Sequence, residues 1–498
     1  METPVTTERP VSIIKLFLVV GGAALVSSCG SDKSSTSSTP DPAIEGPIAG
    51  DPTLQATSFD LATVGYQASE YFLSGTARSF VSANTLQSDG KWSVDVAGTA
   101  EFKTRIVAYR PIDPTKFNGT VIIEWLNVSG GSDAAVDWVM MHNELIRKGY
   151  AWVGVSAQKA GIDGGGFNLT GLMVYLKALN PDRYGSLLHP GDSYAFDMYS
   201  QAAQVVLHPR SIDPLGGLHV QRAIAAGESQ SAFYMLTYVD AIAPLAKLFD
   251  GYFIHSRGHS SAKLSQSPQA DIAMPETVQV RDDLGLPVIM VQTETDLFVL
   301  GSYPDRQPDG ANFRLWEIAG AAHADIYSVQ GAADRGTDPN VVAPVEITAP
   351  VPGVIDCGTP INSGPQHFVV SAAIAGFDSW LRSGVAPAKA NRLEIAGDPP
   401  AIARDSAGIA RGGVRTPPVD APIAILSGEG QTASLACSLF GTTKLLDSTA
   451  LASLYPVHAG YVAAVNASVE SALGGGFLLQ PDGDLFKAWA QASTIGSP

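Results

Sequence analysis

The chain has 498 residues, a formal net charge of −17 and no run of basic residues longer than two. Such a chain lacks the basic surface that binds phosphates, so nucleic acid is excluded as an expected partner. Its length suffices for a large hydrophobic core, and its 50 glycines and 33 prolines predict many loops.

The N-terminal segment has the features of an export signal. An apolar run, residues 16–26, follows Lys15 and is too short to span a bilayer. It ends in small residues before Cys29 and resembles a bacterial lipoprotein signal, which implies that Cys29 carries the lipid. We therefore expect a lipoprotein signal peptide at residues 1–28 and a Ser/Thr-rich tether at residues 29–55. A plain secretory signal with an incidental cysteine is the alternative.

The residue after Cys29 bears on the location of the protein. Gly30 stands there instead of aspartate, and by the usual rule for lipoproteins this favours the outer membrane. We expect a cell-envelope protein that faces the periplasm or the exterior and contacts the membrane only through a lipid anchor. A secreted protein is the alternative.

Two cysteines remain in the mature chain, Cys357 and Cys437. An exported protein meets an oxidising environment, so we expect these two residues to form one disulfide. Two unpaired buried thiols are the alternative.

The remaining sequence predicts a sheet covered by helices. Short alternating runs between residues 59 and 110 predict an antiparallel hairpin. Apolar strands then alternate with helices, which predicts a mostly parallel sheet with helices on both faces. The predicted strands are 119–128, 150–158, 220–227, 249–257, 286–293 and 313–320, and the predicted helices are 133–149, 192–208, 229–239 and 366–384. We expect Asp192 or Ser193 to cap the second helix.

Two segments do not fit this alternation. Residues 258–284 form a polar insertion without a clear strand, at a position where a lid often lies. Residues 386–498 have weak periodicity and many glycines and prolines. We interpret them as a C-terminal extension packed on a core of residues 56–385.

The string Gly-Glu-Ser-Gln-Ser at residues 227–231 lies between a predicted strand and a predicted helix. A nucleophile elbow places a serine in such a strand-to-helix turn, with small residues two positions before and after it. Gly227 and Ser231 meet that steric requirement, although Ser231 departs from the usual glycine. Ser229 is therefore the candidate nucleophile.

Two later strands supply partners for Ser229. Glu294 and Asp296 follow the strand 286–293, and His323 follows the strand 313–320. The order Ser, acid, His is that of the α/β-hydrolases. His323 would accept the serine proton, and a carboxylate would orient the imidazole. We favour Asp296 as this acid and keep Glu294 as the alternative.

An oxyanion formed in this chemistry needs two backbone N–H donors. Gln230, the residue after the nucleophile, is expected to supply one. The loop after the first core strand is expected to supply the other, from Val128 or Ser129, with Gly130 and Gly131 allowing the loop to fold closely. A simple glycine-rich turn is the alternative.

These motifs together resemble a bacterial family of proteins with an α/β-hydrolase domain. The resemblance is carried by "VIIEWLNVSGGSDAAVDW", "GYAWVGVSAQKAGI", "AAGESQSAF", "VQTETD", "GAAHAD" and, near the C-terminus, "GGVRTPPVDAPIAILSGE". It runs from about residue 56 to the end of the chain. It implies an α/β-hydrolase fold and a serine hydrolase whose nucleophile lies in G-E-S-Q-S.

We therefore expect an exported serine hydrolase that cleaves a small-molecule or polymeric carboxylic ester through a Ser229 acyl-enzyme. An amidase or thioesterase with the same triad is one alternative, and a non-catalytic surface-binding lipoprotein is another. No cofactor is expected, because no G-x-G-x-x-G follows a strand. No metal is expected either, because Gly258 separates His255 from His259 and no other ligand motif is present.

Overall fold

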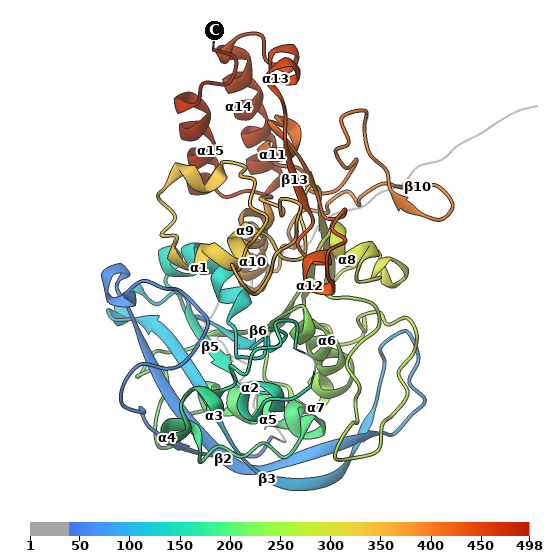
Figure 1. Ribbon diagram of the computed structural model, residues 1–498. Helices are drawn as coiled ribbons and strands as arrows, with labels where there is room; N and C mark the ends of the chain where they lie inside the picture. Colours follow the sequence, from blue (N-terminus) through green and yellow to red (C-terminus); the bar gives the residue numbers. More distant parts are fainter. Residues whose placement is uncertain (1–38, 167, 498) are drawn as a thin grey trace, which may run out of the picture. The chain divides into compact units, whose positions relative to one another are not determined.

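A nine-stranded sheet forms the centre of the computed structural model, which describes residues 39–166 and 168–497 (Figure 1). The strand order is β1-β2-β3-β5-β4-β6-β7-β8-β9. The strands from β5 to β9 in this order pair in parallel, whereas β1, β2 and β3 pair antiparallel. The strands are β1 (Ala43–Glu45), β2 (Tyr66–Ser82), β3 (Val94–Pro111), β4 (Thr120–Trp125), β5 (Ala151–Val155), β6 (Arg222–Glu228), β7 (Gly251–His255), β8 (Val288–Thr293) and β9 (Phe313–Ile318).

The parallel strands are apolar because helices cover both of their faces. Successive residues of a strand point to opposite faces, so Ile122 and Ile123 belong to different hydrophobic clusters. Helices α1 (Val136–Lys148) and α10 (Gln366–Ser383) cover one face, and α5 (Ala195–Leu207) and α6 (Gln230–Thr237) cover the other. The predicted α/β-hydrolase fold class, with a mostly parallel sheet and helices on both faces, is confirmed.

The remaining elements are short or lie in the C-terminal region. They are η1 (Leu61–Val64), η2 (Pro114–Lys116), α2 (Lys159–Asp163), α3 (Leu176–Leu179), α4 (Pro181–Tyr184), η3 (Asp192–Tyr194), η4 (Tyr238–Ile242), α7 (Ala243–Ala246), α8 (Glu294–Phe298), η5 (Tyr303–Asp305), α9 (Ile326–Gln330), η6 (Gly331–Ala333), η7 (Pro339–Val342), β10 (Ile395–Ala396), β11 (Ala401–Ile402), α11 (Pro417–Asp420), β12 (Ala424–Ser427), α12 (Leu435–Ser438), β13 (Thr442–Leu445), α13 (Ser448–Leu454), α14 (His458–Gly475) and α15 (Gln480–Ala492). None of the helices in the described part of the chain combines the length and apolarity needed to cross a membrane.

The start of the folded region differs from the predicted boundary at residue 55. The described part of the expected tether, residues 39–55, packs on the sheet, because β1 pairs with β2 and apolar side chains anchor it. Ile44, Ile48 and Leu54 each pack against a hydrophobic cluster. Cys29 and the expected signal peptide lie outside the described residues.

The predicted helix cap at Asp192 or Ser193 is wrong. Both residues lie in the turn η3, and α5 begins after Tyr194 with no side-chain cap. Asp192 instead accepts a hydrogen bond from the backbone N–H of Lys159 at 2.8 Å. The hydroxyl of Ser193 accepts one from the backbone N–H of Gln266 at 2.8 Å. These contacts connect the start of α5 with the start of α2 and with the loop that contains Gln266.

Residues 258–284 contain neither helix nor strand, as the sequence predicts. Leu264, Val278 and Val280 are nevertheless buried in the same hydrophobic cluster as α5. The buried guanidinium of Arg257 donates hydrogen bonds to the carbonyl oxygens of Gly258, Ser260 and Val278. These contacts attach the segment to the core, and a lid-like role for it stays a prediction.

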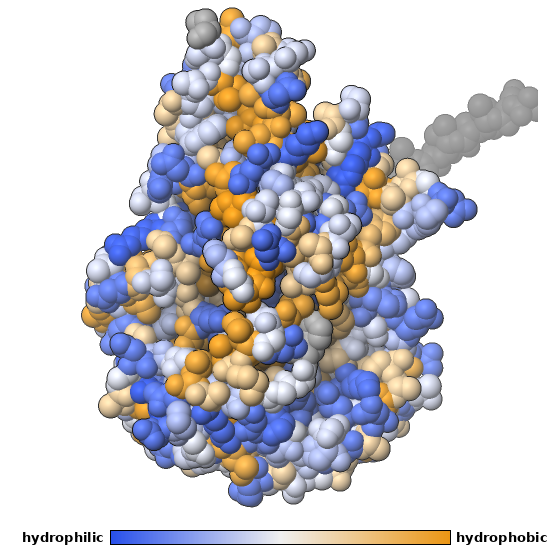
Figure 2. All heavy atoms as spheres, in the orientation of Figure 1, coloured by the Kyte–Doolittle hydropathy of each residue, from blue (hydrophilic) through white to orange (hydrophobic). Residues whose placement is uncertain are grey.

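The C-terminal extension is more regular than its sequence indicates, and it belongs to the same compact unit as the sheet. Helices α14 and α15 pack on each other and on α10, where Phe486 lies 4.8 Å from Phe368 between ring centroids. The α14 sequence, HAGYVAAVNASVESALGG, places small or apolar residues on every side, so no apolar stripe marks it as a helix. On the face seen in Figure 2, hydrophobic residues gather over these helices.

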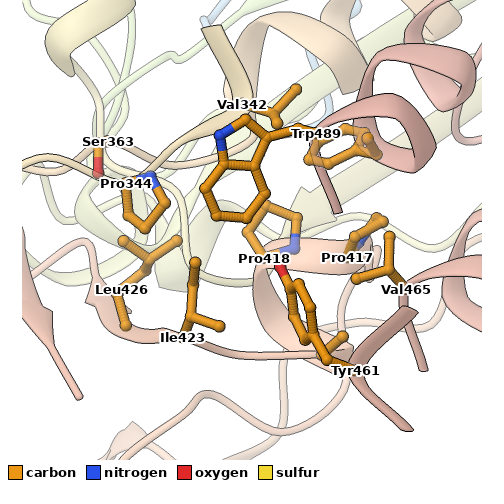
Figure 3. Close-up of a pocket in the computed structure, with 13 residues that line it drawn as sticks. Val342, Pro344, Ser363, Pro417, Pro418, Ile423, Leu426, Tyr461, Val465 and Trp489 are labelled. Carbon is orange, nitrogen blue, oxygen red and sulfur yellow. The ribbon is translucent and has the colours of Figure 1, made fainter. Parts of the chain in front are cut away.

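A small pocket lies where this extension meets Val342, Pro344 and Ser363 of the core (Figure 3). Its walls are almost entirely apolar, with Trp489 from α15, Tyr461 from α14 and Pro417 from α11 among them. No charged side chain and no histidine lines it. The pocket therefore lacks acid–base groups, and the candidate chemistry lies at the sheet edge instead.

Candidate active site

Ser229 lies in a strained turn between β6 and α6. Its backbone has φ 55° and ψ −119°, a left-handed conformation that non-glycine residues rarely adopt. A Cβ atom at Gly227 would lie 2.8 Å from the carbonyl oxygen of Ser231, so only glycine fits at that position. Ser231 is fully buried. The turn thus has the tight geometry that a nucleophile elbow requires.

A chain of hydrogen bonds joins the three residues that the sequence singles out. The Oγ atom of Ser229 lies 2.7 Å from Nε2 of His323, and Nδ1 of His323 lies 2.7 Å from Oδ1 of Asp296. His323 is 5% exposed and Asp296 is fully buried, whereas Ser229 is partly exposed. The nucleophile candidate is thus accessible, and its two partners are shielded from water.

Local structure fixes Asp296 in this orientation. It is the third residue of α8, and its Oδ2 atom accepts a hydrogen bond from the backbone N–H of Thr293 at 2.7 Å. The hydroxyl of Thr293 in turn accepts from the backbone N–H of Asp296 at 3.4 Å. This capping box at the end of β8 leaves Oδ1 facing His323.

Glu294 points elsewhere. Its Oε1 atom accepts from the backbone N–H of Gly320 at 2.6 Å, and Oε2 accepts from Gly428 at 3.0 Å and from Arg404 at 2.8 Å. Burial raises the pKa of Glu294, and the Arg404 guanidinium opposes this shift. These contacts direct Glu294 away from the imidazole, and Asp296, not Glu294, hydrogen-bonds His323.

The loop after β4 approaches the nucleophile turn through Asn127. The Nδ2 atom of Asn127 donates to the carbonyl oxygen of Glu228 at 3.2 Å and to its Oε2 atom at 3.0 Å. Its Oδ1 atom accepts from the backbone N–H of Ser129 at 2.7 Å. Ser129 therefore already uses its amide. Among the described residues, no acceptor occupies the backbone N–H of Val128 or that of Gln230. These two N–H groups are therefore the candidates for the oxyanion donors.

Glu228 brings a second carboxyl group to His323. Its Oε1 atom lies 3.6 Å from Nε2 of His323, the nitrogen that faces Ser229. Burial raises the pKa of Glu228 well above its ordinary value, and the nearby carboxyl groups of Asp137, Asp296 and Glu124 raise it further. From the sequence alone, Glu228 could tune the site, although a residue at this position is more often merely packed or solvated.

A buried hydrogen-bond network that could not be predicted from the sequence lies beneath the turn. The backbone N–H of Ser229 donates to the carbonyl oxygen of His255 at 2.9 Å, and the ring of His255 contacts Oδ1 of Asp137 at 2.9 Å. Gln366, the first residue of α10, lies 3.2 Å from Nε2 of His255 and donates to the carbonyl oxygen of His323 at 3.4 Å. The network connects the nucleophile turn with the histidine loop.

The C-terminal extension packs against the segments that carry Asp296 and His323. Gly428 packs so closely that a Cβ atom there would lie 2.5 Å from Cβ of Glu294. The backbone N–H of Ala324 donates to the carbonyl oxygen of Leu439 at 2.9 Å. Cys357 and Cys437 form a disulfide next to this contact, with a Cα–Cα distance of 5.3 Å. The extension thus holds these two segments in place.

Within the described ranges, no group of three or more histidine, cysteine, aspartate or glutamate side chains is arranged to hold a metal ion. His255 ends β7, Arg257 and His259 come shortly after it, and all three make structural contacts. Arg257 binds backbone carbonyls, and His259 lies 2.8 Å from Oδ2 of Asp305.

The fold agrees with a family comparison. Residues 38–488 match the family model described as an alpha/beta hydrolase domain, so the chain belongs to that family. The chain matches none of the curated proteins with which it was compared.

Solved structures of esterases are similar to part of the chain. Acetyl xylan esterase 1 from Thermoanaerobacterium sp. JW/SL YS485 is 13% identical, with 56% of this chain and 81% of that chain covered and a TM-score of 0.27. The glucuronoyl esterase from Solibacter usitatus is 11% identical, with coverages of 56% and 81% and a TM-score of 0.29. A thermostable esterase from Pseudomonas putida ECU1011 is 14% identical, with coverages of 48% and 66% and a TM-score of 0.24. At such low values, none of them informs the substrate.

Proposed function

We propose that the protein is a serine hydrolase that cleaves a carboxylic ester through a Ser229 acyl-enzyme. The observation that carries this proposal is the continuous hydrogen-bonded chain from Ser229 through His323 to Asp296. The strained turn at Ser229 supports it independently, because strain of this kind persists where the surrounding structure holds a functional residue in place.

In the first step, Oγ of Ser229 attacks the ester carbonyl carbon while its proton moves to Nε2 of His323. Asp296 stabilises the resulting imidazolium through Nδ1. The amides of Val128 and Gln230 would donate hydrogen bonds to the oxyanion. Collapse of the intermediate breaks the bond to the alcohol oxygen, which takes the proton from Nε2 and leaves. Water then repeats these steps on the acyl-enzyme and releases the carboxylic acid.

The experiment is hydrolysis of a short p-nitrophenyl ester by the purified protein. Ser229→Ala should lower kcat by about 10³-fold or more, since the nucleophile is lost. Ser468→Ala, which removes a buried hydroxyl from α14, serves as the matched control and should retain activity. Unchanged turnover by Ser229→Ala would refute the proposal. Amide and thioester substrates belong in the same panel, because the triad does not select the leaving group.

The location of the protein is part of the proposal. The Lys15-flanked apolar run and Cys29 support an exported, lipid-anchored protein of the outer membrane. Cys29→Ser should move the protein from the membrane fraction to the soluble fraction. An unchanged distribution would argue against lipidation.

A further inference from the structure

The carboxyl group of Glu228 has an unusual position, because its carboxyl oxygens lie between an amide and the candidate catalytic base. Oε2 accepts from Asn127 at 3.0 Å, and Oε1 lies 3.6 Å from Nε2 of His323. In the described part of the chain, His323 is the sole basic side chain within ion-pair distance of Glu228. The side chain is 6% exposed, so the group also has little contact with water.

Burial of this carboxyl group does not stabilise the fold. A buried acid near other acids costs free energy, and one hydrogen bond from Asn127 only partly offsets that cost. An apolar side chain of similar size would avoid the cost altogether. The position therefore suggests a task at Nε2 of His323, the atom that exchanges protons with the reacting groups.

A role for Glu228 at this atom arises in deacylation, the second half of the reaction. Once Ser229 is acylated, its Oγ atom no longer donates to Nε2 of His323, and Nε2 can accept a proton from water. We propose that the carboxyl group of Glu228 holds this water beside Nε2 and so promotes hydrolysis of the Ser229 acyl-enzyme. The inference rests on the proposed function of Ser229.

The step balances without any further reactant. The water oxygen forms a bond to the acyl carbon, and one water proton moves to Nε2 of His323. The bond between the acyl carbon and Oγ of Ser229 then breaks, and Oγ takes the proton back from Nε2. The carboxylic acid leaves. Glu228 keeps its own proton throughout and acts through hydrogen bonds to the water.

The surroundings of Glu228 favour its neutral form. Burial raises its pKa, Asp137, Asp296 and Glu124 raise it further, and the Asn127 amide opposes the shift. Because Oε2 already accepts from Asn127, the neutral acid presents its O–H group at Oε1 to the water, and a glutamine side chain can present an N–H group in the same place. Glutamine should therefore replace Glu228 in function, whereas alanine should not.

The test separates acylation from deacylation in the full-length protein. Stopped-flow assays with p-nitrophenyl acetate give the burst rate and the steady-state rate, and intact-protein mass spectrometry follows the acetyl-enzyme. For Glu228→Ala we expect deacylation to slow by about tenfold, acylation to change by less than about twofold and the acetyl-enzyme to accumulate. Glu228→Gln should stay within about threefold of the wild type in both steps.

A control separates this effect from general damage. Glu317→Ala removes another buried glutamate, one that pairs with Arg306, and should lower the melting temperature without changing the ratio of the two rates. If Glu228→Ala does not fold, Glu228→Asp withdraws the carboxyl group by one methylene and should slow deacylation in the same way.

The outcomes are distinguishable. Equal changes of both steps in Glu228→Ala, or no change in either, would overturn the role of Glu228. A glutamine variant as slow as the alanine variant would also overturn it, because it would show that a hydrogen-bond donor at this position is not sufficient. Failure of the wild type to form any acetyl-Ser229 would instead contradict the proposed function itself.

Discussion

Nδ1 of His323 lies 2.7 Å from Oδ1 of Asp296, although Glu294 stands only two residues earlier in the same helix, α8. Glu294 is held by Arg404 and by the amides of Gly320 and Gly428. Asp296→Asn should therefore lower kcat for a p-nitrophenyl ester by about 10³- to 10⁴-fold, because the imidazole loses the carboxylate that fixes its tautomer.

Glu294→Gln is the matched comparison for this prediction. It should weaken the contact with Arg404 and lower the melting temperature, while ester hydrolysis falls far less than in Asp296→Asn. If Glu294→Gln alone abolished turnover, the assignment of the acid to Asp296 would be wrong.

The nucleophile turn has no room for a side chain at Gly227. A Cβ atom there would meet the carbonyl oxygen of Ser231 at 2.8 Å and its carbonyl carbon at 3.0 Å, and these backbone atoms limit relaxation. Gly227→Ala should lower the free energy of unfolding by about 1–3 kcal/mol and slow the reaction of Ser229. Denaturant titration and ester assays measure the two effects. Gly474→Ala on α14, where the space is open, is the control and should be neutral or stabilising.

The disulfide between Cys357 and Cys437 joins residues 80 positions apart and lies beside the loop that carries His323. Replacing both cysteines with serine should lower the free energy of unfolding by about 2–5 kcal/mol, because the unfolded chain is no longer cross-linked. Thermal melting with and without a reductant measures this. The reductant should destabilise the wild type and leave the double variant unchanged. A wild type that melts at the same temperature in both conditions would contradict the prediction.

Asp325 gives the stability of the protein a defined pH dependence. Burial raises its pKa from 3.8 to about 7, against the effect of its hydrogen bond from Ser328. As the pH rises from about 4 to about 7, the unfolded chain loses this proton before the folded chain does. The stability contributed by this group therefore falls over that range and is constant above it.

Asp325→Asn removes this ionisation and keeps a side-chain oxygen for the N–H of Ser328, which Asp325 binds at 2.9 Å. Denaturant titrations should give similar stabilities for both proteins near pH 4, whereas near pH 8 the variant should be more stable by about 2–4 kcal/mol. If the difference in stability between the two proteins did not change with pH, Asp325 would not be the source of the pH dependence.

Most of the fold was predictable because the parallel strands are buried on both faces and therefore read as apolar runs. The triad candidates were predictable for a related reason, since each follows a strand and the carboxyl ends of neighbouring parallel strands meet at one edge. The helix α14 was not predictable, because its alanines, glycines and serines leave no apolar stripe. The cap at Asp192 or Ser193 failed because residues distant in the chain, Lys159 for Asp192 and Gln266 for Ser193, donate hydrogen bonds to these side chains instead.

The parts of the site that depend on long-range packing also could not be predicted from the sequence. Arg404 and Gly428 reach Glu294 from more than a hundred residues away in the chain, and no local pattern marks them. The pairing of Asn127 with Glu228 spans a separation of 101 residues. Asn127 also accepts a hydrogen bond from the backbone N–H of Ser129. From the sequence alone, Ser129 and Val128 were equivalent candidates for the second oxyanion donor.

The central claim is that Ser229 is a nucleophile activated by His323. The most direct measurement is reaction of the folded protein with a fluorophosphonate, followed by peptide mass spectrometry to locate the adduct. The account predicts a single modified residue, Ser229, with labelling lost in Ser229→Ala and strongly slowed in His323→Ala. An unlabelled folded wild type, or an adduct on another serine, would contradict it.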